Sequence, residues 1–284
     1  MNYLAITPAR DEENFLPALI DSMCRQTRLP ARWIIVNDGS RDATARIIDE
    51  AARAYPWIEP RHFPADRPRL EGGESILKQF MTPSLADGFD YILRVDADLS
   101  FAPTMVECLL REFAADPRLG IGGATLYEPS GDTWREVRTP AFHTRGAVKL
   151  YSAPCFRAIG GIDAGLGWDT LDEAAAMLHG FRTRSFPHIQ ARHHRPQGAA
   201  GGLWRGRLAA GRAAYRVGYS PLFMIVRALA RITEPPYVLG SFLMAAGFLE
   251  GYLRGLPRAA SAEVMKFIRT QQRRRLLMMD TVWR

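Results

Sequence analysis

Two aspartates one residue apart, Asp96 and Asp98, follow directly after the apolar run Tyr91–Val95. Such a run predicts a buried strand, and a strand that ends here would deliver both carboxylates to the edge of a sheet. Carboxylate oxygens suit a hard divalent cation such as Mg²⁺ or Mn²⁺, whose other ligands are usually water and phosphate oxygens. The same tripeptide also occurs in turns and helix caps, so a metal site is a hypothesis that needs support from the rest of the chain.

Two earlier segments end in acidic loops in the same way. Residues 3–7 predict a strand that is followed by Asp11 and Glu12, and residues 33–36 predict a strand that leads to Asp38. Helical periodicity follows each loop, so strands and helices alternate. In a parallel sheet built this way, ligands bind at the carboxyl ends of the strands. Three acidic loops at one sheet edge therefore favour a binding site over isolated turns.

The remaining elements extend this pattern. Residues 58–63 predict a weaker strand, a helix is expected to open near residues 71–74, and residues 103–115 predict a helix with proline in its first turn. Residues 119–127 and 183–186 predict further strands. Short connections between strands and helices favour an α/β fold with a mostly parallel sheet and helices on both faces.

Composition points to a folded intracellular protein. The chain has 284 residues, of which 47% are hydrophobic and 24% charged, which excludes a disordered chain and allows a substantial core. Its cysteines, Cys24, Cys108 and Cys155, lack the spacing of a metal site or a disulfide framework. The first residues lack a signal-peptide pattern. We therefore expect a cytoplasmic location.

Charge is distributed unevenly along the chain. Residues 1–180 hold 19 basic and 26 acidic residues, whereas residues 181–284 hold 18 basic and 4 acidic ones. Such an excess of positive charge suits nucleic acid, anionic lipid or a phosphorylated ligand. The arginines flank long aliphatic runs rather than interleaved aromatic residues, which argues against a nucleic-acid surface.

Three segments, in their order and spacing, resemble the nucleotide-sugar half of the family 2 glycosyltransferases of the GT-A fold. They are residues 7–13 (TPARDEE), residues 36–44 (VNDGSRDAT) and residues 95–98 (VDAD). The resemblance covers roughly residues 1–190. It implies that Asp38 accepts a hydrogen bond from the nucleobase, that Asp96 lies near the ribose or the metal, and that Asp98 binds the metal.

The resemblance also assigns the loop after the first strand to the nucleotide. The residues it implies there are Pro8, Ala9, Arg10 and Glu12. The chain departs from the family at Asp11, where the family more often has asparagine. This departure leaves the class intact and the identity of the nucleotide open.

A second acidic segment follows residues 165–167. Asp169, Asp172 and Glu173 lie at the start of an alanine-rich helix that ends at Gly180, a position where acidic residues also stabilise the helix dipole. In family 2 enzymes an aspartate at a fixed distance before such a glycine is the general base. The resemblance therefore implies Asp169 as the base, with Asp172 as the second candidate.

Two adjacent histidines, His193 and His194, follow the last predicted strand. Adjacent histidines are common without any ligand, but in several GT-A enzymes a histidine after the base helix completes the metal shell, and imidazole suits Mn²⁺ better than Mg²⁺. Which of the two would bind stays open. Arg192 and Arg195 could hold a diphosphate or be solvated. The glycine-containing residues 198–218 are expected to form a mobile loop that closes over the donor.

Beyond residue 219 the chain becomes apolar and basic. Residues 235–249 form an uncharged stretch of 15 residues, shorter than the ~20 that span a bilayer. This favours an interfacial or re-entrant hairpin, or a buried pair of helices. Because arginines flank the stretch, peripheral contact with an anionic membrane leaflet is our preferred hypothesis, ahead of a soluble appendage or a dimer interface.

These features predict a GT-A (Rossmann-like) catalytic domain over residues 1–197 and a helical, basic, apolar region over residues 198–284. The expected activity is the inverting, Mn²⁺- or Mg²⁺-dependent transfer of one sugar from a nucleoside diphosphate sugar, UDP-linked, to a lipid-linked or polysaccharide acceptor at the inner face of the plasma membrane. The Gln-x-x-Arg-Trp signature of processive synthases is absent. A nucleotidyltransferase, which would need a glycine-rich, lysine-bearing loop after the first strand, and a basic nucleic-acid-binding module are the alternatives. The oligomeric state stays open.

Overall fold

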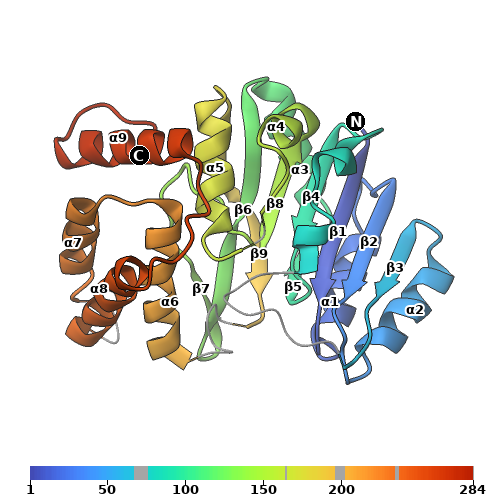
Figure 1. The fold of residues 1–284 in the computed structure, drawn as a ribbon. Coiled ribbons are helices and arrows are strands. Elements are labelled where there is room, and N and C mark those ends of the chain that lie inside the picture. The colour runs from blue at the N-terminus through green and yellow to red at the C-terminus, as the bar shows by residue number, and fades with distance from the viewer. Residues whose placement is uncertain (67–75, 164, 196–201, 234–236, 284) are drawn as a thin grey trace.

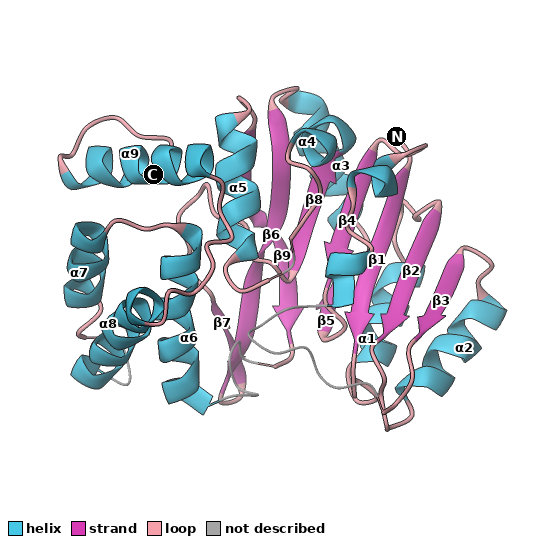
Figure 2. Ribbon diagram, in the orientation of Figure 1, coloured by secondary structure: helices cyan, strands magenta, loops and turns pink. Residues whose placement is uncertain are grey.

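The structure of the chain is a computed structural model, and it describes residues 1–66, 76–163, 165–195, 202–233 and 237–283. In these residues the strands form one sheet in the order β3-β2-β1-β4-β8-β6-β9-β5, and β7 pairs with β6. Helices cover both faces of the sheet, and further helices form a separate layer beside one end of it (Figure 1, Figure 2).

The strands are β1 (Tyr3–Ala9), β2 (Arg32–Asn37), β3 (Ile58–His62), β4 (Tyr91–Val95), β5 (Leu99–Phe101), β6 (Leu119–Ser130), β7 (Thr133–Glu136), β8 (Val148–Ser152) and β9 (Arg182–His193). The α-helices are α1 (Leu16–Cys24), α2 (Thr44–Ala54), α3 (Met105–Ala115), α4 (Ala153–Ala158), α5 (Trp168–Leu178), α6 (Gly202–Val217), α7 (Pro221–Ala230), α8 (Tyr237–Leu253) and α9 (Ala262–Leu276), and two 3₁₀ turns span Ile76–Gln79 and Pro83–Ala86.

Parallel strands make the first half of the sheet. β1 pairs in parallel with β2 and β4, and β2 pairs in parallel with β3. Side chains alternate between two cores: Ala5 packs with α1, α2 and α3 on one face, while Leu4 and Ile6 pack with α4 on the other. Because both faces are covered, β1, β2 and β4 are largely apolar, whereas the edge strand β3 is mostly polar. Their carboxyl ends meet at the lower edge of the sheet in Figure 1.

The second half of the sheet is mixed. β8 pairs antiparallel with β4 and with β6, and β6 pairs in parallel with β9. β9 extends to His193 and is therefore longer than the strand expected at residues 183–186. The mostly parallel sheet expected from the sequence thus describes β1 to β4, and the rest of the sheet mixes antiparallel pairs with the parallel pair of β6 and β9.

Residues 202–217 form helix α6, so the expectation of a mobile loop at residues 198–218 is wrong for this stretch. α6 packs against α8 at two glycines. A Cβ on Gly211 would lie 2.0 Å from the carbonyl oxygen of Met244, and one on Gly247 would lie 2.1 Å from that of Leu208. Gly211, which lies in the expected loop, and Gly247 of α8 instead allow two helix backbones to touch.

The C-terminal helices share a core with the sheet domain. Ala174 of α5, Met244 of α8 and Ile268 of α9 belong to one buried apolar cluster. Among the residues that the structure describes, no helix has the length and apolar character needed to cross a membrane. The predicted domain boundary after residue 197 and the helix start expected at residues 71–74 fall outside the described ranges.

Candidate active site

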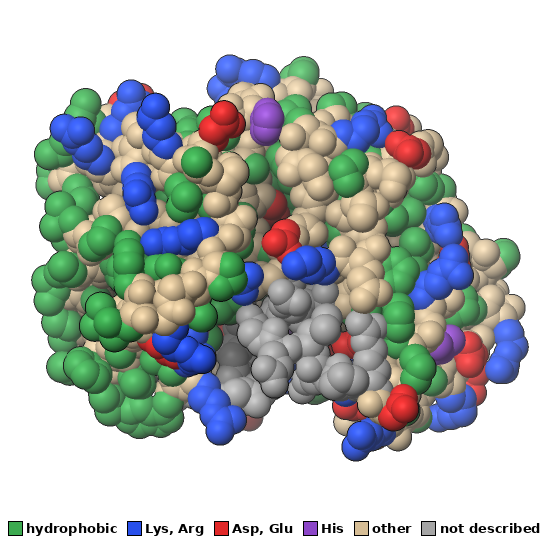
Figure 3. Space-filling view, viewed as in Figure 1, with side chains coloured by type: hydrophobic (Ala, Val, Ile, Leu, Met, Phe, Trp, Pro, Cys, Tyr) green, Lys and Arg blue, Asp and Glu red, His purple; other side chains and the backbone are tan. Residues whose placement is uncertain are grey.

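A carboxylate pair and a histidine meet at the carboxyl end of β4. Ligand atoms of Asp96, Asp98 and His193 lie within 4.8 Å of one another. The sheet brings them together, because β4 ends just before Asp96 and β5 pairs Leu99 directly with His193. Of the two histidines that the sequence left open, His193 is thus the one grouped with the aspartates. Figure 3 shows acidic and basic side chains gathered in the middle of this face, between the sheet and the C-terminal helices.

Asp98 is buried among basic groups. Its Oδ1 lies 3.3 Å from His193 Nε2, and its Oδ2 accepts a hydrogen bond from Arg195 Nε at 3.2 Å. Burial alone would raise the pKa of Asp98, but His193 and Arg195 outweigh it and lower the pKa. In the same way the carboxylate raises the pKa of His193 against the effect of burial. Asp98 is therefore ionised at neutral pH, which is the form that binds a cation.

Asp96 has a more open environment. Its side chain is 28% exposed, and its Oδ1 lies 2.6 Å from the guanidinium of Arg94. Partial loss of hydration raises the pKa of Asp96, and the charge of Arg94 opposes the rise. Arg94 is itself buried, and its Nη1 has no hydrogen-bond partner among the described residues. Asp98 is thus enclosed by His193 and Arg195, whereas Asp96 is partly open to solvent.

Arg195 joins this cluster to the loop after β1. Its Nη2 lies 3.0 Å from Asp98 Oδ2 and forms a short ion pair with Oε1 of Glu12. Burial raises the pKa of Glu12, although Arg195 opposes it. The other carboxylate oxygen of Glu12, Oε2, has no hydrogen-bond partner within the described ranges. Arg195 is thus ion-paired with two carboxylates while its side chain remains 38% exposed.

The expected nucleotide-binding residues lie side by side at the ends of β1 and β2. Pro8 and Ala9 are in register with the last residues of β2, and Arg10 Nη1 lies 3.5 Å from Asp38 Oδ2. Asp11 has a φ of 55°, in the left-handed region that aspartate and asparagine tolerate better than most residues. Its Oδ1 accepts a hydrogen bond from a backbone N–H in the loop after β2. An aspartate here thus keeps a backbone conformation and a hydrogen bond that asparagine would also allow.

His194 lies outside the carboxylate cluster. Its Nε2 is 2.8 Å from Ser100 Oγ, and its ring contacts the rings of Phe15 and Trp134 at centroid distances of 6.2 and 5.4 Å. Burial lowers the pKa of His194. The two adjacent histidines therefore belong to different surroundings, because successive residues at a strand end point in opposite directions.

The second acidic segment begins helix α5. Gly167 precedes the helix with a φ of 89°, and a Cβ there would lie 2.6 Å from Val217 at the end of α6, so glycine is required for conformation and for space. Asp169 lies in the first turn with its side chain 28% exposed, and its Oδ2 is 4.0 Å from His143 Nε2. The start of the helix is thus fixed against α6 while this carboxylate remains accessible.

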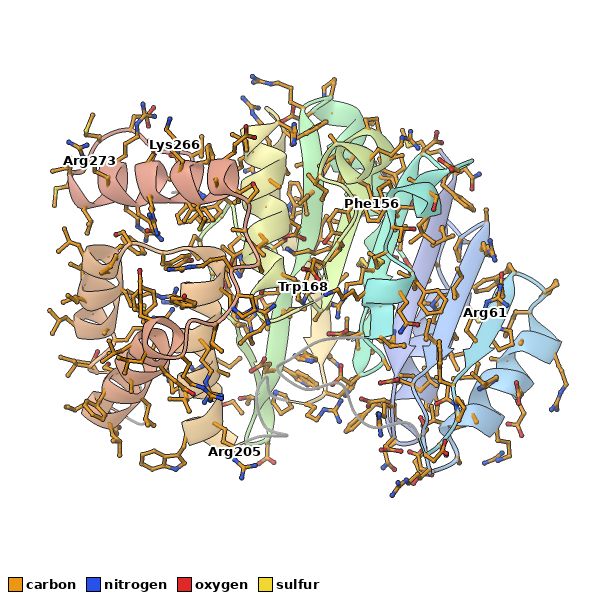
Figure 4. The ribbon with its side chains drawn as sticks, viewed as in Figure 1. Arg61, Phe156, Trp168, Arg205, Lys266 and Arg273 are labelled. Atoms are coloured by element: carbon orange, nitrogen blue, oxygen red, sulfur yellow. The ribbon has the colours of Figure 1, made fainter. Side chains whose placement is uncertain are left out.

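Trp168 connects the two acidic regions. The Arg94 guanidinium lies 4.7 Å from the centroid of the Trp168 ring, and the same guanidinium pairs with Asp96. Figure 4 shows Trp168 between the sheet and the C-terminal helices. Since Asp169 follows Trp168 in the chain, contacts run without a break from the carboxylate pair to the start of α5.

Behind this first turn of α5 lies a buried charge network. Lys149 Nζ is 2.9 and 3.0 Å from the carboxylate oxygens of Asp172 and 3.2 Å from Glu173 Oε1. Tyr151 donates to Asp172 at 2.5 Å, and His143 Nδ1 lies 2.8 Å from Glu173 Oε2. Burial raises the pKa of Asp172 to about 6 against the charge of Lys149. The pKa of Glu173 is lowered, because Lys149 and His143 outweigh its burial.

Sequence reasoning missed Lys149, His143 and Arg94. Lys149 lies within the otherwise apolar strand β8 and is fully buried. A lysine in the middle of a buried strand is almost always paired, and this was the one available signal. The partners themselves come from another element, α5, so the sequence alone could not identify them.

The donor atoms at Asp96, Asp98 and His193 fit a divalent cation. Two carboxylates and one imidazole suit Mn²⁺, or Mg²⁺ with more water ligands. His193 would bind as neutral imidazole, so metal binding would release its proton. The partly exposed Asp96 leaves a side of the cluster open to further ligands.

Comparison with known proteins agrees with this geometry. The family model described as Glycosyl transferase family 2 matches residues 4–162. Undecaprenyl-phosphate 4-deoxy-4-formamido-L-arabinose transferase of Proteus mirabilis (strain HI4320) is 29% identical over 160 residues, which are 55% of this chain and 43% of that protein. The uncharacterized glycosyltransferase YibD of Escherichia coli (strain K12) is 27% identical over 132 residues, 45% of this chain and 36% of that protein. The chain thus aligns with less than half the length of these relatives.

Solved structures show the same fold. The mannosyltransferase PcManGT from Pyrobaculum calidifontis, in complex with GDP-Man and Mn²⁺, has a TM-score of 0.56 at 14% identity, covering 94% of this chain and 78% of that one. S. aureus TarS 1–349 has a TM-score of 0.55 at 15% identity, covering 89% and 72%. These likenesses confirm the expected GT-A α/β fold with a helical C-terminal region. Because the family model covers more than half of the chain, the protein belongs to glycosyl transferase family 2.

Proposed function

We propose that this chain is an inverting, metal-dependent glycosyltransferase that moves one sugar from a nucleoside diphosphate sugar, UDP-linked, to a lipid-linked acceptor. The observation that carries the proposal is the cluster of Asp96, Asp98 and His193 at the carboxyl end of β4. Two similar solved structures hold nucleotide sugars: PcManGT with GDP-Man and Mn²⁺, and TarS with UDP-GlcNAc. This supports the same class of donor here.

On the donor side, Asp98 and His193, with Asp96, would hold Mn²⁺ or Mg²⁺, which supplies positive charge for the diphosphate leaving group. Asp38 accepts a hydrogen bond from the nucleobase. The other residues that we assign to the nucleotide are Pro8, Ala9, Arg10 and Glu12. Arg195 contacts both Glu12 and Asp98, so it links the nucleotide loop to the metal ligands.

On the acceptor side, Asp169 is the general base. An acceptor hydroxyl is a poor nucleophile, and a carboxylate can remove its proton while the new glycosidic bond forms. Asp169 is partly exposed, whereas Asp172 is buried against Lys149 and Tyr151. This supports Asp169 as the base and gives Asp172 the role of holding α5 in place. A base on one side of the sugar and the leaving group on the other invert the anomeric centre.

The acceptor and the location follow from the same proposal. One relative is named for transfer to undecaprenyl phosphate, which supports a lipid-linked acceptor for this chain as well. We place the enzyme at the inner face of the plasma membrane, in peripheral contact with the bilayer, because the sequence from residue 181 onward is strongly basic. Residues 1–197 would be the catalytic unit and residues 198–284 the unit that reaches the membrane.

Sugar-nucleotide hydrolysis and transfer with added Mn²⁺ test the donor half. For Asp98→Ala, turnover should fall by ~10²-fold or more, because charge stabilisation of this kind contributes several kcal/mol. Asp163→Ala is the control, since Asp163 is an exposed acid that pairs with Lys78 at the surface. Equal metal-dependent turnover in wild type and Asp98→Ala would sink the proposal.

Two conservative variants test the acceptor half. Asp169→Asn should keep donor binding and lower turnover by ~10²-fold or more, the scale of general-base catalysis. Asp172→Asn should act mainly on stability. If Asp172→Asn alone abolished turnover in a protein that remained folded, Asp172 and not Asp169 would be the base.

A further inference from the structure

Helix α7 presents an apolar stripe to solvent. Leu222, Ile225, Val226 and Leu229 are 41% to 63% exposed, and their spacing places them on one side of the helix. The opposite side carries Met224 and Ala228, which are buried in the C-terminal core. A helix whose inner and outer sides are both apolar is normally covered on both.

Helix α8 repeats this arrangement. Val238, Phe242, Leu249 and Leu253 recur at helical spacing and are 56% to 79% exposed. Its inner side packs through Met244 and Phe248. Its only charged residue, Glu250, pairs with Arg212 and Arg254, so the outward side of α8 carries no unbalanced negative charge.

The two stripes form one continuous surface, which we name the α7–α8 surface. α7 packs against α8, and Figure 3 shows hydrophobic side chains gathered along the edge of the molecule that these helices occupy. Contiguous apolar patches of this kind mark interaction sites on soluble proteins.

Basic residues border this surface. Arg231 directly follows α7, Arg254 follows α8, and Arg273, Arg274 and Arg275 form the last turn of α9. Figure 4 shows Arg273 at the outer end of α9, on the same side of the molecule as α7. An apolar centre with a rim of arginines is complementary to an anionic lipid surface, where side chains such as leucine enter the acyl boundary and cations meet the head groups.

We infer that the α7–α8 surface docks on an anionic bilayer, with both helices lying along the membrane plane. A second copy of the chain is the main competing occupant. A two-fold dimer would set the same patch against itself and would bring the arginine rims of both copies together, which costs free energy through like-charge repulsion. A bilayer with anionic head groups instead neutralises the rim.

Docking in this way would also serve the proposed reaction. This link between docking and catalysis rests on the proposed function, whereas the docking itself does not. α5, whose first turn carries Asp169, packs against α6 and α9, and these helices share one core with α7 and α8. The base is therefore rigidly connected to the docking surface. Docking would therefore hold the base in a fixed position relative to the bilayer that carries a lipid-linked acceptor.

Vesicle co-sedimentation tests the inference directly. The full chain should bind vesicles of equal parts phosphatidylglycerol and phosphatidylcholine, bind pure phosphatidylcholine more weakly, and lose the difference at high salt. Ile225→Glu combined with Phe242→Glu should lower the partition coefficient at least ~10-fold, because burying each apolar side chain contributes more than the 1.4 kcal/mol that a tenfold change requires. The matched control is Leu29→Glu with Tyr55→Glu, two exposed apolar positions far from α7 and α8 in sequence.

Three results would contradict docking of the α7–α8 surface on a bilayer. Retained vesicle binding in the Ile225→Glu and Phe242→Glu variant would overturn it, and so would equal loss in the control. A concentration-dependent dimer in sedimentation velocity that the same double variant dissolves would show that a second copy covers the surface. Sugar-nucleotide hydrolysis without lipid and the melting temperature should be unchanged in the Ile225→Glu and Phe242→Glu variant, so a folding defect is detected separately. Vesicle binding does not depend on catalysis, so failure of the proposed activity would leave this result standing.

Discussion

Asp98 and Asp172 are both buried aspartates beside basic side chains, but their partners differ in kind. Asp98 is held by His193 and by Arg195, whose side chain is 38% exposed. Asp172 is held by Lys149, which is fully buried, and by Tyr151. His193 is buried, but Arg195 is partly exposed and can exchange Asp98 for another partner. The partners of Asp172 are closed within the protein.

The surroundings of Asp98 can rearrange when a ligand binds, whereas those of Asp172 hold a fixed geometry. When a cation binds Asp98, the partly exposed Arg195 can move away from the carboxylate, whereas His193 would remain beside it as a second metal ligand. A helix that aims a general base must not shift, and a buried ion pair with several hydrogen bonds fixes geometry because breaking it leaves an uncompensated charge. We therefore expect substitutions on the metal side to act on binding and those behind α5 to act on stability.

Lys149→Met should have the largest effect on stability. Removing the cation that bridges Asp172 and Glu173 leaves the buried Asp172 without a charged partner among the described residues and leaves Glu173 with His143 alone. Losses of this kind cost about 3–5 kcal/mol. Thermal or urea unfolding would measure it. Lys78→Met is the matched control, since Lys78 pairs with Asp163 at the surface at 2.9 Å and such pairs contribute about 1 kcal/mol or less. Equal effects in the two variants would contradict the contrast between the regions.

Addition of Mn²⁺ should stabilise the fold through the metal side alone. A ligand that binds only the folded state adds about 2.7 kcal/mol at a hundred times its dissociation constant. Asp98→Asn should abolish the shift in melting temperature, whereas Lys149→Met should lower the starting temperature and keep the shift. A shift that survived in Asp98→Asn would place the metal elsewhere, and chelation of wild type provides the baseline.

His143→Gln should show a stability loss that depends on pH. Burial alone would lower the pKa of His143, but Glu173 and Asp169 outweigh it and raise the pKa above the ordinary 6.5. The charged pair therefore stabilises fully below pH 6.5 and loses its contribution as the pH rises through the raised value. We expect His143→Gln to cost about 1–3 kcal/mol below pH 6.5 and less at pH 9.

Unfolding of His143→Gln measured from pH 5.5 to pH 9 would show this trend. His188→Gln is its control, because His188 pairs with Glu112 at 3.0 Å with a side chain that is 61% exposed. Exposed pairs of this kind contribute about 0.5 kcal/mol. A loss in His143→Gln that stayed constant over the whole range would mean that the histidine is not charged in the folded protein.

The metal side could be predicted from the sequence because its residues follow strand ends in short motifs. Asp38, Asp96 and Asp98 each follow a predicted strand, and parallel pairing brings the strand ends together without further information. His193 was also anticipated, but the choice between it and His194 was not. That choice depends on β5, three residues whose pairing with β9 sets the register.

The closed network behind α5 could not be predicted in the same way. Lys149, His143 and Glu173 come from β8, from the loop before it and from α5, so their contacts depend on antiparallel packing in the second half of the sheet. The local sequence pattern of each element does not reveal which residues of distant elements it will contact. The glycines of α6 illustrate the opposite error, because Gly211 indicates flexibility in the sequence and close helix packing in the structure.

The smallest effect should come from the contact that joins the two regions. Arg94 pairs with Asp96 and lies over the ring of Trp168 at 4.7 Å, so the Arg94–Trp168 contact couples the metal side to the start of α5. A double-mutant cycle with Arg94→Met and Trp168→Leu, measured as kcat/KM with Mn²⁺, should give a coupling of about 0.5–2 kcal/mol, the range of buried cation–π pairs. The control pair is the exposed Arg184 and the buried Phe186, whose guanidinium-to-ring distance is 5.5 Å, and it should give no coupling in kcat/KM. Additive effects at Arg94 and Trp168 would mean that the metal side and the base side act independently, and that the closed network holds Asp169 without reference to the donor.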